Sequence, residues 1–502
     1  MSYTLGIDIG TFESKGVLVD RAGAIVASAA TPHKMIVPQP GWAEHRAEED
    51  WWADLKILAR RLLEQTAVDP RDIEALGCSA IGPCMLPLDV AGRPLMNAVL
   101  YGVDGRAERE VVELTERIGE ETLLDRCGNA LTSQSVGPKI LWLRRNRPEI
   151  FAQIDKIVTS TSYLVYRLTG EFVIDHYTAA NFSPLYLVDE LGWSDELADD
   201  IVALDKLPRV AWSAEVAGRI TPEAAAETGL AEGTAVITGT IDAAAEALSV
   251  GVTAPGDMML MYGSTIFIIA LSDTRVRDPR LWYAPWLFEG QHASMAGLAT
   301  SGTLTHWFRE QLARDLKPED AFALLAEEAE GSPPGAKGLI FLPYFSGERT
   351  PIHDPFAKGA LYGLNLTHGR GDIYRALLEG IAQGTRHVIE TYREVGQAPR
   401  RLLAVGGGTR NRIWCQATSD TSGIDQILCE KTLGASYGDA FLAALAVGTV
   451  QVEDIAAWNP VATSLRAEPS PVYDKQYDLF RRLYEQTRDI ARELSEPRAF
   501  PI

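Results

Sequence analysis

The sequence lacks several features that mark common classes of protein. Its 502 residues include five cysteines and no C-x-x-C pair, which argues against a disulfide framework or a structural zinc and indicates reduced thiols. Positive charge is scarce, because 47 lysines and arginines face 68 aspartates and glutamates, for a formal net charge of -21. Nucleic acids and anionic membranes favour basic surfaces, so neither is an expected partner.

No segment is suited to crossing a membrane or to export. The longest apolar stretch, residues 258–271, is short and is interrupted by Gly263-Ser264-Thr265, so no transmembrane helix is predicted. The N-terminus has no basic region followed by an apolar core, so a cytoplasmic location is expected. The length exceeds what one hydrophobic core serves. We therefore predict two domains, residues 1–248 and 249–502, with the Gly/Pro-rich passage at 251–257 between the halves.

Each predicted half contains the same structural device. Residues 3–8 and 16–20 read as strands around a hydroxyl-rich turn, and residues 258–262 and 266–270 read as strands around Gly263-Ser264-Thr265. Such turns can point several backbone N–H groups into one concavity and hold a phosphate. Further strands are predicted at 24–27 and 75–81, and helices from Asp50 onward and at 106–119, 138–146 and 221–228. No G-x-x-x-x-G-K-[ST] occurs, which disfavours a P-loop enzyme.

The first turn, Asp8 to Lys15, contains candidates for binding a metal–nucleotide complex. Asp8 ends the first strand, where its carboxylate can hold a hydrated Mg²⁺. Thr11 and Ser14 supply small hydroxyl groups, and Lys15 can direct a positive charge toward phosphates. An ordinary hairpin turn, in which the Asp and Thr satisfy local backbone, fits the same residues.

A third segment places a carboxylate where a strand meets a helix. The strand at 235–237 ends near Gly239, and Asp242 begins a helix rich in small residues. An Asp here can be a simple N-cap. It can also accept the hydroxyl proton of an acceptor substrate at the base of an interdomain cleft, because phosphoryl transfer requires positioning, Mg²⁺ and one carboxylate near the nucleophile.

A fourth segment admits two interpretations. The strand at 402–405 runs into Gly406-Gly407-Gly408, where glycines let the backbone approach a ligand closely. The run nearly matches the dinucleotide fingerprint G-x-G-x-x-G but fails at Asn411, and Glu430 only weakly meets the acidic position about twenty residues onward. An NAD-dependent dehydrogenase is therefore the alternative from another reaction class.

These segments, in this order, resemble the FGGY carbohydrate kinases over essentially the whole chain. Further resemblance lies in Gly41-Trp42-Ala43-Glu44, in Pro138-Lys139-Ile140-Leu141-Trp142-Leu143, in residues 343–351 and in residues 359–380. The resemblance implies an α/β fold of two ribonuclease-H-like, actin-like ATPase domains with an interdomain catalytic cleft. It also implies ATP and Mg²⁺ as cofactors, with the sugar and the first phosphate turn in the N-terminal domain and the nucleotide in the C-terminal domain.

The resemblance also assigns roles residue by residue. Asp242 matches the catalytic base and contacts the substrate, and Asp8 matches the Mg²⁺-associated aspartate. Trp42 and Asp104 fall at the sugar site. The expected nucleotide-binding residues are Thr11, Ser14 and Lys15 in the first turn, Gly263 and Ser264 in the second, Gly302 near the nucleotide, and Gly407, Gly408 and Asn411 in the adenosine turn.

The chain departs from the family at the sugar-contacting segment. It has Gly82-Pro83 where xylulokinases carry Met-His and glycerol kinases carry Arg-Glu, so the substrate is not inherited from either. We expect phosphorylation of a small sugar or polyol, with a ketopentose such as xylulose or a related pentitol or tetritol as the first choice. A non-catalytic sugar or nucleotide sensor on the same fold is a further alternative, and a homodimer is left open.

Overall fold

The computed structural model describes residues 2–495, which form two compact units. The first unit contains the chain up to Thr253, together with Asp273–Ala293 and Leu433–Pro460. The second contains Ala254–Ser272, Ser294–Thr432 and the chain from Val461 onward. The units are therefore not contiguous in sequence, because two segments beyond residue 248 belong to the first.

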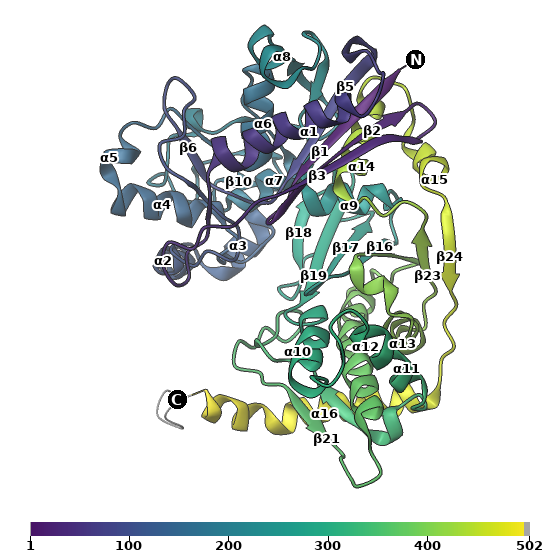
Figure 1. Cartoon of the computed structure of the whole chain (residues 1–502). Helices are drawn as coiled ribbons and strands as arrows, with labels where there is room; N and C mark the ends of the chain where they lie inside the picture. The colour runs from purple at the N-terminus through teal and green to yellow at the C-terminus, as the bar shows by residue number, and fades with distance from the viewer. Residues whose placement is uncertain (1, 496–502) are drawn as a thin grey trace. The chain divides into compact units, whose positions relative to one another are not determined.

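The first unit is built on a mixed sheet with the strand order β13-β14-β5-β1-β2-β3. Figure 1 labels β5, β1, β2 and β3 of this sheet. The strands are β1 (Tyr3–Ile9), β2 (Glu13–Asp20), β3 (Ile25–Pro32), β5 (Ile73–Ala80), β13 (Val216–Arg219) and β14 (Ala235–Ile237). The first three strands are antiparallel neighbours, whereas β5 runs parallel to both β1 and β14. The strands predicted in residues 3–27 and at 75–81 are confirmed.

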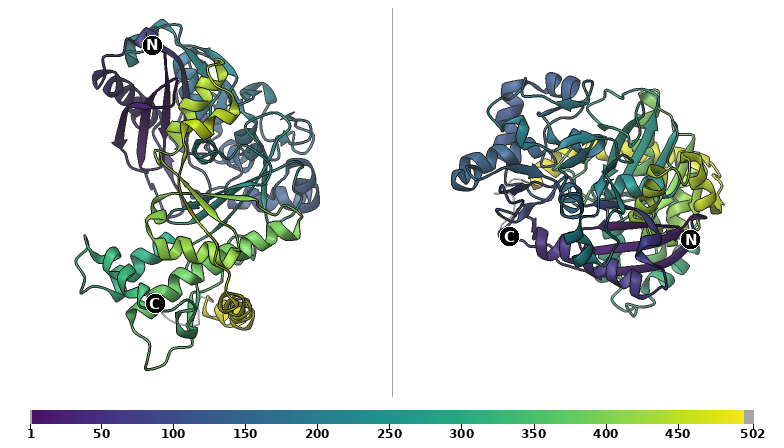
Figure 2. Two further views of the ribbon diagram at one scale, coloured as in Figure 1. Left: turned by 90° about the vertical axis from the view of Figure 1, so that its right-hand side faces the viewer. Right: turned by 90° about the horizontal axis from the view of Figure 1, so that it is seen from above.

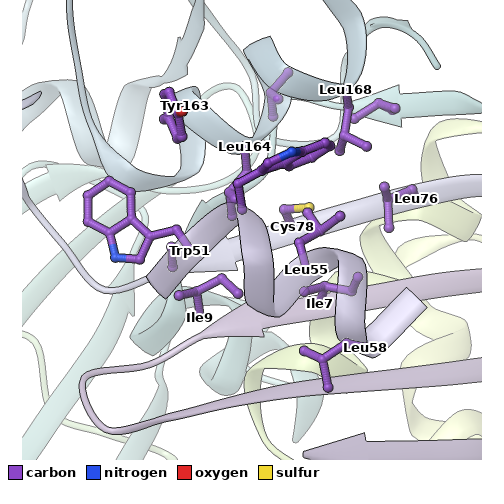
Figure 3. Packing of buried hydrophobic residues seen from close by; sticks show 14 of the residues in the cluster. Ile7, Ile9, Trp51, Leu55, Leu58, Leu76, Cys78, Tyr163, Leu164 and Leu168 are labelled. Carbon is purple, nitrogen blue, oxygen red and sulfur yellow. The ribbon is translucent and has the colours of Figure 1, made fainter. Parts of the chain in front are cut away.

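Helices α1 (Ala53–Glu64) and α6 (Ser160–Thr169) contribute to the main core of the first unit. Figure 3 shows Leu55 and Leu58 of α1 beside Ile7 and Ile9 of β1, and all four side chains are fully buried. Successive side chains of a strand point to opposite faces. Position 6, which directly precedes Ile7, therefore faces the other side of the sheet.

That other face is covered by α14 (Ala435–Ala446), which packs in turn against α9 (Asp242–Ser249). The packing is unusually close, since a Cβ added to Gly6 would stand 1.9 Å from the Ser436 carbonyl oxygen, and one on Gly77 would stand 2.3 Å from that of Asp439. Both strand positions must therefore be glycine. Figure 2 shows this late helix, in yellow-green, beside the purple N-terminal strands.

The second unit repeats the hairpin-plus-parallel pattern. Its sheet contains β19-β17-β16-β22-β23-β24 in that order. The strands are β16 (Asp257–Tyr262), β17 (Ile266–Ser272), β19 (His292–Leu298), β22 (Arg401–Val405), β23 (Gln426–Cys429) and β24 (Val461–Leu465). The β16–β17 hairpin is antiparallel, and β22 lies parallel to both β16 and β23. The repeated device predicted from the sequence is confirmed.

The long helices of the second unit form one group in which the longest contacts the other four. They are α10 (Gly302–Leu312), α11 (Ala321–Glu330), α12 (Arg370–Glu394), α13 (Arg412–Ser422) and α16 (Pro471–Leu494). In the first unit the three predicted helices are confirmed as α2 (Glu108–Ile118), α4 (Val136–Asn146) and α8 (Pro222–Thr228). Within residues 2–495 no helix combines the length and the apolar character needed to cross a bilayer.

Candidate active site

Asp242 is the first residue of α9, and Ile241 is the N-cap. Its Oδ1 accepts a hydrogen bond from the N–H of Ala243 at 2.7 Å, and its side chain makes no N-cap hydrogen bond. The N-cap interpretation is therefore wrong. Burial raises the pKa of Asp242 to about 7, the Ala243 N–H opposes the rise, and the charge of Glu246 adds to it. A carboxyl group that titrates near neutral pH is suited to accepting a proton.

Asp8 lies close enough to Asp242 for their charges to interact. Burial raises the pKa of Asp8 well above its ordinary value, and the charges of Asp242 and Glu246 raise it further, while Lys15 and the Ser79 hydroxyl lower it. Lys15 stands opposite Asp8 in the β1–β2 register. The structure thus brings together three of the predicted site residues, Asp8, Lys15 and Asp242.

Two further carboxyl groups complete this cluster and were not predicted. Glu246 lies four residues after Asp242, and this spacing places both on one face of α9. Asp439 of α14 is fully buried and accepts a hydrogen bond from Ser79 Oγ at 2.7 Å, while Ser79 Oγ also lies 3.4 Å from Asp8 Oδ1. The i,i+4 spacing was a usable signal for Glu246. Asp439 had none, because only tertiary packing brings α14 to this sheet.

The carboxyl cluster is rich in oxygen donors and short of positive charge. Among residues 2–495 no group of three or more His, Cys, Asp and Glu side chains converges closely enough to enclose a metal ion. Mg²⁺ usually keeps several waters and binds proteins through one or two carboxylates. The residues present therefore fit a hydrated Mg²⁺ at Asp8 rather than an ion enclosed by protein ligands.

The predicted residues of the first turn differ in their exposure to solvent. Thr11 Oγ1 lies 3.3 Å from the Tyr101 hydroxyl, and the Lys15 side chain is 44% exposed and paired with Glu13 at 3.3 Å. Ser14 differs, because its side chain is fully buried and Oγ donates to Asp54 Oδ2 at 2.6 Å. In this structure the Ser14 hydroxyl therefore connects the turn to helix α1 rather than facing solvent.

The second unit contains a cavity of about 710 Å³. Six predicted nucleotide-binding residues line it: Gly263, Ser264, Gly302, Gly407, Gly408 and Asn411. Asn411 is the N-cap of α13 and accepts the Trp414 N–H through Oδ1 at 3.1 Å. The volume falls within the range of small-molecule sites, and the glycines leave room for a ligand near the backbone.

The remaining wall of this cavity was not predicted. Phe322, Ala323 and Ala326 of α11 supply an apolar surface, and Tyr374 of α12 and Trp414 of α13 supply aromatic rings. An apolar and aromatic lining with a few polar groups suits a nucleoside. No local motif marks these residues, since they converge from separate helices.

Gly302 holds two segments of this cavity together, and its substitution is expected to weaken the binding of a ligand there. Its N–H donates to the Gly263 carbonyl at 3.0 Å, and an added Cβ would stand 2.4 Å from that oxygen. We expect Gly302→Ala to raise the dissociation constant of a ligand in this cavity by about tenfold or more, because backbone atoms must move apart. Gly369→Ala is the matched control at another helix start, where the nearest contact is 3.9 Å away. Equal dissociation constants for the two variants would contradict this account.

Asp104 and Trp42 are brought together by Arg106. Asp104 is fully buried, and its carboxylate accepts from the Ala43 N–H at 2.7 Å and from Arg106 Nη2 at 2.7 Å. The Arg106 guanidinium lies 3.9 Å from the centre of the Trp42 ring and also pairs with Glu44 at 2.8 Å. Asp104 therefore fixes a buried cation that in turn fixes the Trp42 ring.

Comparison with known proteins agrees with this arrangement. The N-terminal domain of the FGGY family of carbohydrate kinases matches residues 3–249, and its C-terminal domain matches residues 258–447. The chain is 31% identical to the xylulose kinase of Escherichia coli (strain K12), over 96% of this chain and 98% of that protein. It is 28% identical to the xylulose kinase of Bacillus subtilis (strain 168), over 98% of each.

A solved structure gives the same result for the fold. The xylulose kinase from Rhodospirillum rubrum superimposes with a TM-score of 0.92 at 33% identity, covering 98% of this chain and 100% of that one. The chain therefore has the two-domain α/β fold of the actin-like ATPase kind, and its family is one of phosphotransferases. The chain belongs to the FGGY family of carbohydrate kinases and is a sugar kinase that uses ATP.

This assignment decides between the alternatives drawn from the sequence. The strand–helix–strand unit β22–α13–β23 is parallel, as a dinucleotide fingerprint requires. However, family membership over both domains identifies a phosphotransferase rather than a dehydrogenase or a non-catalytic sensor. The glycine-rich turn at 406–408 therefore belongs to a kinase.

Proposed function

We propose that this enzyme transfers the γ-phosphoryl group of ATP to a hydroxyl of a small sugar or polyol, with Asp242 as the base. The observation that carries the proposal is the position of Asp242 at the start of α9, beside Asp8, with its pKa raised to about 7 mainly by burial. A base whose pKa lies near the working pH accepts a proton efficiently as the acceptor oxygen attacks.

The reaction is a single in-line displacement. The acceptor hydroxyl oxygen bonds to the γ-phosphorus, the bond to the bridging oxygen of ADP breaks, and the hydroxyl proton passes to the Asp242 carboxylate. Thr11 and Lys15 in the first turn bind phosphate oxygens, and Ser264 lines the cavity of the second unit. Asp8 would hold a hydrated Mg²⁺, which would supply positive charge near the phosphates.

The other predicted residues bind rather than react. Gly302, Gly407, Gly408 and Asn411 line the nucleotide cavity of the second unit. Asp104 acts through Arg106, which fixes the Trp42 ring as one wall of the sugar site. This division makes the first unit the sugar-binding domain and the second the nucleotide-binding domain.

For the acceptor we propose a ketopentose such as xylulose, or a related pentitol or tetritol. Support comes from the relatives named as xylulose kinases. Gly82-Pro83 replaces the sugar-contacting pairs of xylulokinases and glycerol kinases, so this chain must contact its sugar through other residues. A coupled assay of ADP release over ketopentoses, pentitols, tetritols and glycerol tests the proposal. We expect one of the first three classes to give the highest kcat/KM, and ADP release that no sugar stimulates would refute it.

The raised pKa of Asp242 predicts the pH dependence. Only the ionised carboxylate can accept a proton, so kcat/KM for the sugar should fall about tenfold per pH unit below a pKa near 7 and level off above it. The profile is measured at saturating Mg²⁺ and ATP between pH 5 and pH 9. A rate that stays constant down to pH 5 would exclude Asp242 as the base.

A further inference from the structure

A buried histidine cluster lies beneath the first phosphate turn. His33 follows β3, and Asp54 belongs to the first turn of α1. The side chains of His33 and Asp54 are only 5% and 8% exposed. Neither residue has a role in the mechanism above, yet both contact the strand–turn–strand segment that carries Thr11.

The contacts of His33 define its protonation. Its Nε2 lies 3.0 Å from the carbonyl oxygen of Gly10, and its Nδ1 lies 2.8 Å from Asp54 Oδ2. Ser14 Oγ donates to the same Asp54 oxygen at 2.6 Å. A carbonyl oxygen only accepts, and an ionised carboxylate only accepts. Both ring nitrogens must therefore carry hydrogen, which makes the His33 ring a cation.

The charged groups around His33 favour the same state. Burial disfavours the charge, but the hydrogen bond and charge of Asp54, the Gly10 carbonyl and the charge of Asp50 together raise the pKa of His33. The neighbouring ring of His45 lies 5.0 Å away, edge to face.

His45 itself stays neutral. Its Nδ1 accepts the indole N–H of Trp51 at 3.0 Å, and burial, with the His33 charge, lowers the pKa of His45 to about 4. The pair therefore carries one positive charge, on the His33 ring, whose Nε2 lies against the Gly10 carbonyl.

The contact with Gly10 orients a phosphate-binding group. The carbonyl of Gly10 and the N–H of Thr11 belong to one planar, trans peptide group and point in opposite directions. A hydrogen bond that holds the carbonyl beneath the turn thus directs the Thr11 N–H to the other side. The His33 backbone N–H also donates to the Phe12 carbonyl at 2.9 Å. Glycine at position 10 makes rotation of this peptide group easy unless such contacts prevent it.

We propose that His33 is a positioning residue: its imidazolium, bridging Asp54 and the Gly10 carbonyl, holds the 10–14 turn in the orientation that binds the phosphates of ATP. This inference rests on the proposed function for the phosphate site. It assigns to His33 a control over ATP affinity that depends on protonation. The sugar site is not involved.

The test compares His33→Gln with wild type across pH. A Gln side chain can donate to the carbonyl but carries no charge, so the KM for ATP should rise about tenfold at pH 6 while the KM for the sugar changes less than about twofold. The ratio of the two ATP KM values should fall toward one as pH rises through the pKa of His33, because wild type then loses its cation. A ratio that does not vary with pH would overturn the proposal.

A second variant and a direct measurement keep the test decisive. Asp54→Asn removes the charge of the partner, so the pKa of His33 should fall. The pH at which the KM for ATP begins to rise should therefore move lower. Selective ¹⁵N-histidine spectra, assigned by the signal lost in His33→Gln, should show two protonated ring nitrogens at pH 6.5 without ATP. A neutral ring there would refute the inference.

His292→Gln is the control for histidine loss in the same unit, since His292 Nδ1 contacts the Tyr283 hydroxyl at 2.8 Å. Its ATP KM should match that of wild type. Failure of the proposed function is distinguishable, because wild type itself would then show no sugar-dependent ADP release.

Discussion

Asp242→Asn is expected to fold and bind both substrates but to lose phosphoryl transfer, with kcat lower by roughly 10²–10⁴. Asparagine keeps the shape of the side chain and can keep the 2.7 Å hydrogen bond from the Ala243 N–H. It cannot accept the proton of the attacking hydroxyl at neutral pH. Initial rates and ATP and sugar binding, measured side by side, separate lost chemistry from lost affinity.

The same variant should gain stability at alkaline pH. The folded-state pKa of Asp242, about 7, lies above its ordinary value of 3.8. Proton binding therefore stabilises the fold fully below the ordinary pKa, and this stabilisation is lost as pH rises through about 7. Removing the carboxylate should raise the free energy of unfolding at pH 8 by up to about 4 kcal/mol. The gain should shrink as pH falls from about 7 toward 4, which melting curves at pH 5 and pH 8 can measure.

Glu246→Gln is the matched control for charge in this cluster. Glu246 raises the pKa of Asp242, so its neutralisation should leave the base in place and shift the acid limb of the rate profile to lower pH. Turnover near the wild-type value in Asp242→Asn would refute the role of Asp242. Equal losses in the two variants would mean that the cluster acts through its total charge rather than through one base.

Gly438→Ala is expected to destabilise the first unit and to impair catalysis together. Position 438 lies inside α14, and an added Cβ would stand 1.9 Å from the Ala245 carbonyl oxygen of α9. A backbone atom cannot swing aside as a side chain can, so the helices must separate. Overpacking of this kind costs about 1–3 kcal/mol or more, and the better helix propensity of alanine offsets at most about 1 kcal/mol.

The loss of activity follows from what α9 carries. A shift of α9 moves Asp242 and Glu246 relative to Asp8, so kcat should fall by at least about tenfold. Gly192→Ala is the control, because its nearest contact would be 3.7 Å away. Thermal melting and kcat are measured for both variants. Wild-type values for Gly438→Ala would show that the two helices tolerate separation.

Predictions from the sequence succeeded where the signal is local. The β1–β2 and β16–β17 hairpins, and the strand before the helix at Asp242, follow from apolar runs broken by Gly, Ser and Thr. The family resemblance rested on the same short motifs, and both family domains match the chain. Six glycine, serine and asparagine positions taken from those motifs line one cavity.

Predictions from the sequence were incomplete where residues distant in the chain meet. Nothing near Asp439 indicates that its helix packs on β1 and β5, because that contact depends on glycines at positions 6 and 77. Ser14 belongs to the predicted turn, but its alternation along β2 directs it to Asp54 beneath. No sequence motif marked His33.

By itself the sequence determined the strands and the two turns, because hydrophobic periodicity and turn chemistry are properties of neighbouring residues. The kind of fold and the expected roles of Asp8 and Asp242 came from the family resemblance that its motifs carry. Only the tertiary structure decided which carboxyl groups lie close enough to interact electrostatically and in which direction their pKa values shift. It also showed that a buried cation lies beneath the first turn. Those properties depend on burial and on distances between segments, which chain order does not specify.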